Sequence, residues 1–256
     1  MQKIIINFLS ILLVSCASTG TNINPPQFNK PTNTNNRYYP SNDWTIRNEN
    51  DIKPLLNKIK GSRSYTQDGV LIVDLNGGII DGKKQSGSGN QNENQEPLFR
   101  AEIPFALKNG FVMNNKNAAT FNAPYSGLKN ITFTNIGEDA VATSRKAQNF
   151  LVKDCEFINP GGDKSIQLNQ AKGAEISNNL IYGGITGVRV HESSWAAKDD
   201  EAFCSKNKFI GVDTAWNVSK GKLVVSSPNS YTGVRTPFKI NKGAEIKNPD
   251  GKVTRE

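Results

Sequence analysis

One alternation of apolar and polar positions recurs four times between residues 128 and 219. The copies begin at Leu128, Val152, Ile176 and Cys204, so they are about 24 to 28 residues long, a period typical of solenoids and shorter than a propeller blade. Aligning the copies gives three columns of mostly apolar positions, which we expect to stack on one another: Leu128, Val152, Ile176 and Cys204; Ile131, Cys155, Asn179 and Asn207; Phe133, Phe157, Ile181 and Phe209.

Each copy contains a short alternating run rich in Ile, Val, Phe and Thr, then a Gly or Asn turn, then a second alternating run. No stretch between the runs has a helical period long enough for a crossover helix, which argues against a βαβ fold. The pattern therefore predicts an all-β chain that forms a right-handed parallel β-helix, in which equivalent positions stack about 4.8 Å apart. The alternative is an antiparallel β-sandwich that has this spacing by chance.

The β-helix domain is expected to span residues 44–240. Near its start, the segment from Asp51 to Gly61 predicts a short helix, because its apolar residues share one helical face, Pro54 lies in the first turn and glycine follows the end. We expect this helix to cover the open end of the apolar core. Residues 241–256 are polar, and we expect them to form a tail outside the domain.

The N-terminal residues are typical of an exported bacterial lipoprotein. Residues 1–15 have a charged start, a short apolar run and small residues, as signal peptides do. The end of this segment resembles the bacterial lipobox, which implies cleavage before Cys16, lipidation of its thiol and attachment to a membrane. Residues 16–43 are rich in Asn, Thr, Pro and Ser, so they predict a disordered tether. A plain signal peptide with an incidental cysteine is the alternative.

Composition narrows the choice of partner. The chain has 31 Lys and Arg residues against 23 Asp and Glu residues, a formal net charge of +8, which favours a polyanion. We do not expect nucleic acid, because the sequence contains no helix-turn-helix, zinc-finger spacing or aromatic RNA-binding motif. We expect the protein to be a monomer.

The cysteines, the histidine and two tryptophans are assigned structural places. Cys155 and Cys204 are expected two coils apart, about 10 Å, which exceeds the roughly 7 Å limit for a disulfide, so we expect buried free thiols. His191 is the only histidine, and we place it on an outward strand position outside the active site. Trp195 and Trp216 could stack on sugars, although Trp216 suits the core equally well.

Charged residues gather on one side of the predicted coils. Glu138 and Asp139 follow one turn, Asp163 and Lys164 the next, and Arg189 a third, so they lie on neighbouring coils within about 10 Å along the axis. Adjacent carboxylates indicate either a solvated turn or a cation site, and oxygen ligands without histidine suit Ca²⁺. The candidate calcium ligands are Glu138, Asp139 and Asp163. Lys164 or Arg189 could then hold or deprotonate an anionic sugar.

Several short motifs occur in a fixed order between residues 95 and 192: Glu96-Pro-Leu-Phe-Arg100, Leu107-Lys-Asn109, Gly137-Glu-Asp-Ala140 and Asp163-Lys-Ser-Ile-Gln-Leu-Asn169, with Arg189 one coil later. This segment resembles the small pectate lyases of polysaccharide lyase family 3. The resemblance implies a parallel β-helix enzyme that cleaves an acidic pectic polysaccharide by β-elimination with Ca²⁺, and the lipobox-like segment would anchor this enzyme at the cell surface. It also implies that Glu138 and Asp139 bind calcium, that Lys164 is a catalytic lysine and that Arg189 lies at the scissile uronate.

Two other interpretations remain open. Asn117 stands where the family has a calcium-binding aspartate, and Thr186 replaces a second lysine. These differences favour a non-catalytic β-helix lipoprotein that binds acidic glycans. The other interpretation is an inverting hydrolase that uses Asp139 and Asp163 as its two carboxyl groups, which requires a separation of about 6.5 to 9.5 Å.

Overall fold

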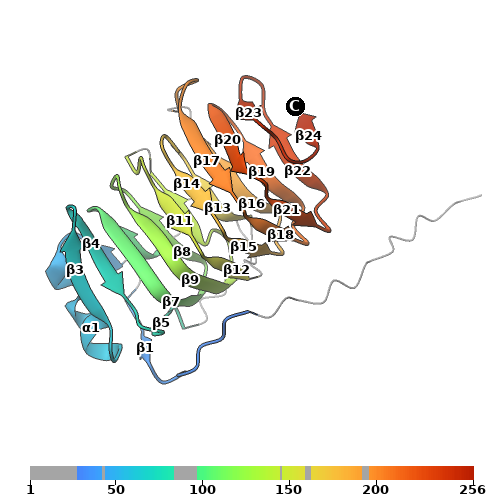
Figure 1. Cartoon of the computed structure of the whole chain (residues 1–256). Coiled ribbons are helices and arrows are strands. Elements are labelled where there is room, and N and C mark those ends of the chain that lie inside the picture. Colours follow the sequence, from blue (N-terminus) through green and yellow to red (C-terminus); the bar gives the residue numbers. More distant parts are fainter. Residues whose placement is uncertain (1–27, 42–43, 84–96, 145, 159–162, 192–195) are drawn as a thin grey trace, which may run out of the picture.

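The computed structural model describes residues 28–41, 44–83, 97–144, 146–158, 163–191 and 196–256. The chain is mostly β-strand and winds into coils that stack along one axis, from the N-terminal coils at one end to the C-terminal coils at the other (Figure 1). Every strand pair is parallel except the first hairpin, β3 with β4. The fold is therefore an all-β parallel solenoid, as the periodicity predicts, and a β-sandwich is excluded.

Two sheets form the walls of the solenoid. The nine-stranded sheet contains β2 (Trp44–Ile46), β6 (Pro97–Ala101), β8 (Asn117–Phe121), β10 (Val141–Thr143), β13 (Lys164–Leu168), β16 (Thr186–Val190), β19 (Thr214–Val218), β22 (Thr236–Ile240) and β24 (Val253–Arg255). The other sheet has fifteen strands, and its long strands β7 (Phe105–Asn115) and β9 (Gly127–Ile136) join two arms.

The first arm of the fifteen-stranded sheet contains β3 (Arg63–Gln67), β4 (Val70–Asp74), β11 (Leu151–Lys153), β14 (Glu175–Ser177), β17 (Glu201–Ser205), β20 (Lys222–Ser227) and β23 (Glu245–Lys247). The second arm contains β1 (Arg37–Tyr38), β5 (Ile79–Asp81), β12 (Glu156–Ile158), β15 (Leu180–Tyr182), β18 (Lys208–Ile210) and β21 (Ser230–Thr232). Each complete coil thus contributes one strand to the nine-stranded sheet. To the two arms it contributes either two short strands, one in each arm, or one long strand that runs through both, as β7 and β9 do.

The first and third predicted columns are confirmed by the strand registers. In the first, Val152 pairs with Leu128 and Ile176, and Ile176 pairs with Cys204. In the third, Phe157 pairs with Phe133 on one side and with Ile181 on the other. Like residues stack because equivalent inward positions of neighbouring coils face the same core.

The second column becomes a ladder of buried amides toward the C-terminal end. The Asn179 side-chain nitrogen donates to Asn207 Oδ1 at 2.9 Å, and the Asn207 nitrogen donates to Asn229 Oδ1 at 3.0 Å. The same amides also bond to the backbone, for example to Cys155 N and Val152 O. The ladder therefore satisfies polar groups that would otherwise be costly to bury.

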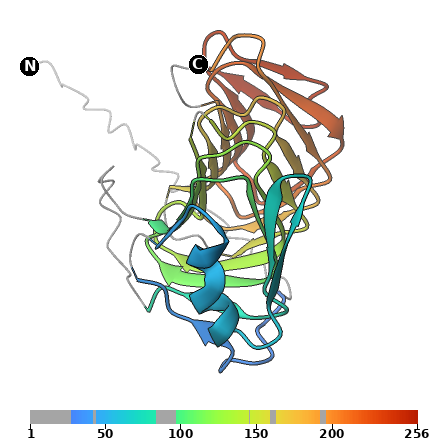
Figure 2. The same ribbon diagram turned by 90° about the vertical axis from the view of Figure 1, so that its left-hand side faces the viewer.

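The predicted helix is confirmed. A 3₁₀ turn (Glu49–Ile52) leads into α1 (Lys53–Lys58), and Asn48 caps the turn with a reciprocal capping box to Asp51. The apolar residues of this segment belong to the same hydrophobic core as the coils. Figure 2, a view toward the N-terminal coils, shows α1 in front of them. The helix thus covers apolar side chains that the first coil would otherwise expose.

Two expected boundaries are wrong. Residues 241–256 are not a separate tail, because β23 and β24 extend the two sheets by pairing with β20 and β22. Backbone pairing needs no apolar outer face, which is why a polar segment adds a last coil. Within the expected tether, β1 pairs with β5, and Tyr38 packs edge-on against Trp44 with ring centroids 5.1 Å apart. Residues 1–27, with Cys16, lie outside the described residues.

The cysteine assignment is confirmed for the described part of the chain. Cys155 and Cys204 are free, and each is 1% exposed. Burial raises the pKa of each thiol to about 12, so both behave as small apolar residues. Within the described ranges, the protein contains no helix that is long and apolar enough to cross a membrane.

Candidate active site

The candidate site lies in the nine-stranded sheet, at the starts of β10 and β13. In β13, Ser165 and Ile166 are fully buried, and Lys164 comes directly before them. One coil earlier, Asp139 comes directly before two buried residues, of which Val141 pairs with Ile166. Asp139 and Lys164 therefore occupy equivalent register positions on consecutive coils.

Lys164 lies between two carboxylates. Its Nζ is 2.5 Å from Asp163 Oδ2 and 3.6 Å from Asp139 Oδ1. The Lys164 side chain is only 8% exposed, and those of Asp139 and Asp163 are 14% and 24% exposed. Because neighbouring carboxylates favour the charged form of an amine, Lys164 is held as an ammonium. Lys164 is thus covered rather than exposed, and it has the same strand parity as the buried residues Ile166 and Leu168.

The backbone before β10 completes the cluster. Asn117 Oδ1 accepts a hydrogen bond from Asp139 N at 3.1 Å and so orients the turn. Glu138 N donates to Lys116 O at 2.7 Å. The buried Oε2 atom of Glu138 has no hydrogen-bond partner among the described residues, so the turn keeps one carboxylate acceptor available.

The carboxylates suit Ca²⁺ in their chemistry but not in their arrangement. All the candidate ligands are oxygen donors, as Ca²⁺ prefers. In the described part of the chain, however, no three His, Cys, Asp or Glu side chains are arranged to hold a metal ion. The Lys164 ammonium contacts both Asp139 and Asp163, where a shared cation would have to bind. Calcium binding therefore stays a prediction, and the roles considered for Lys164 and Arg189 do not involve the ion.

The same contacts argue against an inverting hydrolase. Asp139 and Asp163 contact one nitrogen at 3.6 and 2.5 Å. Their contacting oxygens are therefore at most about 6 Å apart, which is less than the roughly 6.5 to 9.5 Å that places a water molecule opposite a sugar.

Arg189 is a partly exposed, outward residue of β16, one coil after Lys164 and toward the other end of the strand. It pairs with Gln167 on one side and Asn217 on the other, whereas Lys164 pairs with Thr186. Arg189 follows Thr186 by three residues, which is about 10 Å along a strand. Its Nε is 3.5 Å from Ser219 Oγ. The structure thus brings Asp139, Asp163 and Lys164 into contact and leaves Arg189 at a distance that a bound sugar could bridge.

A row of outward residues extends from Arg189 in both directions, and sequence reasoning missed it. Successive strand registers place one partly exposed residue per coil in this row: Arg100, Thr120, Ala142, Gln167, Arg189, Asn217 and Lys239. In the motif Asp-Lys-x-Ile-Gln, the row position is the residue three after the lysine. Counting three residues from the position equivalent to Lys164 in every coil would have identified Arg100 and Lys239 as further basic residues in the row of Arg189.

His191 and Trp216 are both part of the core. His191 is fully buried and adopts a left-handed backbone with φ of 57°. Its Nδ1 accepts from Ala171 N at 3.2 Å, and its Nε2 lies 3.4 Å from Lys222 O. Burial lowers the pKa of His191, so the ring is neutral. The expected outward position is therefore wrong, because the chain turns directly after β16. Trp216 is also fully buried, and Trp195 lies outside the described residues.

Comparison with known proteins does not assign the chain to a family. No protein-family model matches the chain, and no solved structure matches it.

Proposed function

We propose that this protein acts on an acidic polysaccharide of the polygalacturonate type and cleaves it by β-elimination at the nine-stranded sheet. The observation that carries the proposal is the contact of Lys164 with Asp163 and Asp139 on consecutive coils, with Arg189 on the next coil. These are the residues on which the resemblance to pectate lyases rests. We also infer that the coils wind with the right-handed sense that parallel crossover connections almost always have.

β-Elimination would give Arg189 and Lys164 different roles. Elimination removes the C5 proton, which is acidic because it lies next to the uronate carboxylate, and breaks the bond from C4 to the glycosidic oxygen, which takes up a proton. Arg189 can pair with the uronate carboxylate through two parallel hydrogen bonds and so stabilise the negative charge that develops there. Lys164 can accept the C5 proton only after its ammonium has lost its own. Turnover should therefore rise toward alkaline pH.

The test is digestion of polygalacturonate by the wild-type protein, followed through the absorbance of unsaturated uronate ends. Arg189→Ala should weaken polymer binding roughly tenfold or more, because it removes a charge-assisted hydrogen-bond pair, and should reduce product accordingly. Arg63→Ala is the matched control: it removes the same charge from β3, on the other sheet, where the Arg63 side chain is 72% exposed. A fully active Arg189→Ala variant would contradict the assigned role.

A second candidate function is binding of an acidic glycan without cleavage. It is favoured by the pairing of the Lys164 ammonium with two carboxylates, which leaves the cluster without a neutral amine. In the same digestion, polymer retained by the protein with no unsaturated ends at any pH, with or without added Ca²⁺, supports this candidate over the lyase.

We further propose that the mature protein is anchored in a membrane by lipid at Cys16 and is exposed on the cell surface or the periplasmic side. The support is the lipobox-like sequence before that residue. The full chain should partition into the detergent phase, and Cys16→Ala should leave it unprocessed or move it to the aqueous phase, because several acyl chains make membrane attachment effectively permanent. Recovery of wild-type protein in the aqueous phase, with its N-terminus at another residue, would contradict the anchor.

A further inference from the structure

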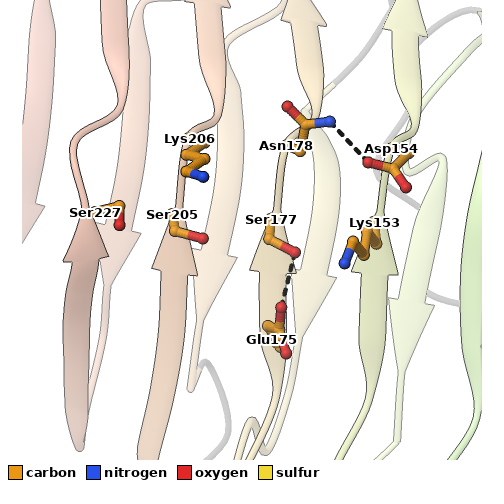
Figure 3. Close-up of a pocket in the computed structure, with 8 residues that line it drawn as sticks. All are labelled: Lys153, Asp154, Glu175, Ser177, Asn178, Ser205, Lys206 and Ser227. Atoms are coloured by element: carbon orange, nitrogen blue, oxygen red, sulfur yellow. Dashed lines mark hydrogen bonds between the residues drawn. The ribbon is translucent and has the colours of Figure 1, made fainter.

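A second polar site lies on the fifteen-stranded sheet, away from the candidate active site. A groove with a volume of about 370 Å³ crosses the outer ends of β11, β14, β17 and β20 (Figure 3). Its lining is charged and polar, and every lining residue belongs to the described part of the chain. A volume of this size lies within the range of sites that take small ligands.

The groove exists because short side chains stack between longer ones. Ser177 pairs with Ser205, and Ser205 pairs with Ser227, so three hydroxyls lie on neighbouring strands over about 10 Å. At the bend after each strand, Asn178 and Lys206 adopt left-handed backbones with φ of 55°, and their side chains form one wall. Figure 3 shows the serines side by side, with these longer side chains beyond them.

The polar groups of the groove are unevenly satisfied. Its carboxylates are engaged: Asp154 accepts a hydrogen bond from Asn178 at 2.7 Å, and Glu175 accepts one from Ser177 at 2.8 Å. The side chains of Lys153 and Lys206, which also line the groove, make no hydrogen bond or ion pair with any described residue. The groove thus presents two ammonium groups that no described carboxylate pairs with, and the carboxylate of a ligand would complement them.

An exposed aromatic ring borders the same surface. Phe203 is 37% exposed and lies two residues before Ser205 on β17, so both side chains point outward from the sheet. Its strand neighbours in register are Glu175 and Val224, which form the row next to the serines. An aromatic face beside hydroxyl groups suits the apolar face of a sugar ring together with the polar groups at its edge.

We propose that this groove binds an acidic saccharide, with the sugar ring against Phe203, its hydroxyls on the serine row and its carboxylate on Lys153 or Lys206. The site lies on a different sheet from Lys164 and Arg189, so it retains a polymer rather than cleaving it. It goes beyond the proposed function and does not depend on it, because a binding groove operates whether or not the other face catalyses elimination.

The test is calorimetric titration of trigalacturonate into the Arg189→Ala protein, in which binding at the candidate active site is already weakened. Ser205→Ile fills the groove with a side chain that suits a strand and should reduce affinity at least tenfold. Ser230→Ile is the control, because Ser230 lies on β21 and is exposed outside the groove. Phe203→Ser replaces a residue that is already exposed and should also weaken binding, so the test does not depend on how Ser205→Ile folds.

The outcomes separate this proposal from the lyase proposal. Equal affinity of the Arg189→Ala and the Arg189→Ala/Ser205→Ile proteins would overturn the groove, even if the wild-type protein is a lyase. Equally tight binding of neutral cellotriose would overturn the assignment of an acidic ligand.

Discussion

Replacing Phe157 by alanine should lower the free energy of unfolding by about 3 to 5 kcal/mol, as for other buried phenylalanines. Phe157 is 0% exposed, and its ring stacks on Phe133 with centroids 5.1 Å apart and planes 1° from parallel. Ile181 follows it in register on the next coil. The cavity would lie in the middle of the ladder, where coils on both sides are fixed by backbone pairing and cannot collapse around it.

Denaturant unfolding of the wild-type and variant proteins measures this loss. Phe203→Ala is the matched control, because it truncates the same type of side chain on the outer face of β17, where the ring is 37% exposed. The control should change stability by about 1 kcal/mol or less. A neutral Phe157→Ala variant would show that the ring is not a rung of the core, and the stacking of the columns would have to be abandoned.

The register of the coils was predictable because a solenoid repeats its neighbours. An inward position in one coil stacks on the equivalent position in the next, so an aligned pattern such as Phe133 and Phe157 directly gives a strand pair. The first and last coils lack this support. The residues of β24 are mostly polar and exposed outward, and only the position of a preceding strand shows that they continue the sheet.

The candidate site was predictable in its membership but not in its geometry. The sequence places Asp139, Asp163 and Lys164 on neighbouring coils, and the structure brings them into contact. Their burial depends on how these three side chains pack against one another, which no periodicity encodes. The burial of His191 was not predictable either, because it depends on contacts with a distant part of the chain, such as Lys222 O beside the ring.

The burial of Lys164 changes what its removal should do. An outward, exposed lysine could be replaced by alanine without affecting stability. In the structure, the Lys164 ammonium lies between Asp139 and Asp163. Lys164→Ala therefore leaves two negatively charged carboxylates close together and only partly hydrated. Removing one partner of a fully buried pair costs about 3 to 5 kcal/mol. Because both carboxylates keep some exposure, we expect a smaller loss, about 2 to 3 kcal/mol.

Unfolding of Lys164→Ala, Lys164→Met and Lys164→Met/Asp139→Asn separates charge from packing. Methionine keeps most of the buried stem but not the ammonium, so Lys164→Met should be nearly as unstable as Lys164→Ala. The second substitution removes one of the facing carboxylates and should restore part of the loss; with the Asp139→Asn single variant completing the double-mutant cycle, the coupling energy should be favourable by about 1 kcal/mol or more. All three proteins without Lys164 should fail to produce unsaturated uronate ends, since each lacks the amine.

Calcium provides an independent readout of the same contact. With the ammonium removed, Asp139 and Asp163 have no cation between them, and Ca²⁺ prefers such oxygen ligands. Adding Ca²⁺ should therefore raise the melting temperature of Lys164→Ala more than that of the wild-type protein, through binding to the folded state alone, and Lys164→Ala/Asp163→Asn should lose this response. An unchanged melt for Lys164→Ala, with no response to Ca²⁺, would mean that Lys164 is exposed and unpaired, and the charge cluster on which the proposed function rests would not exist.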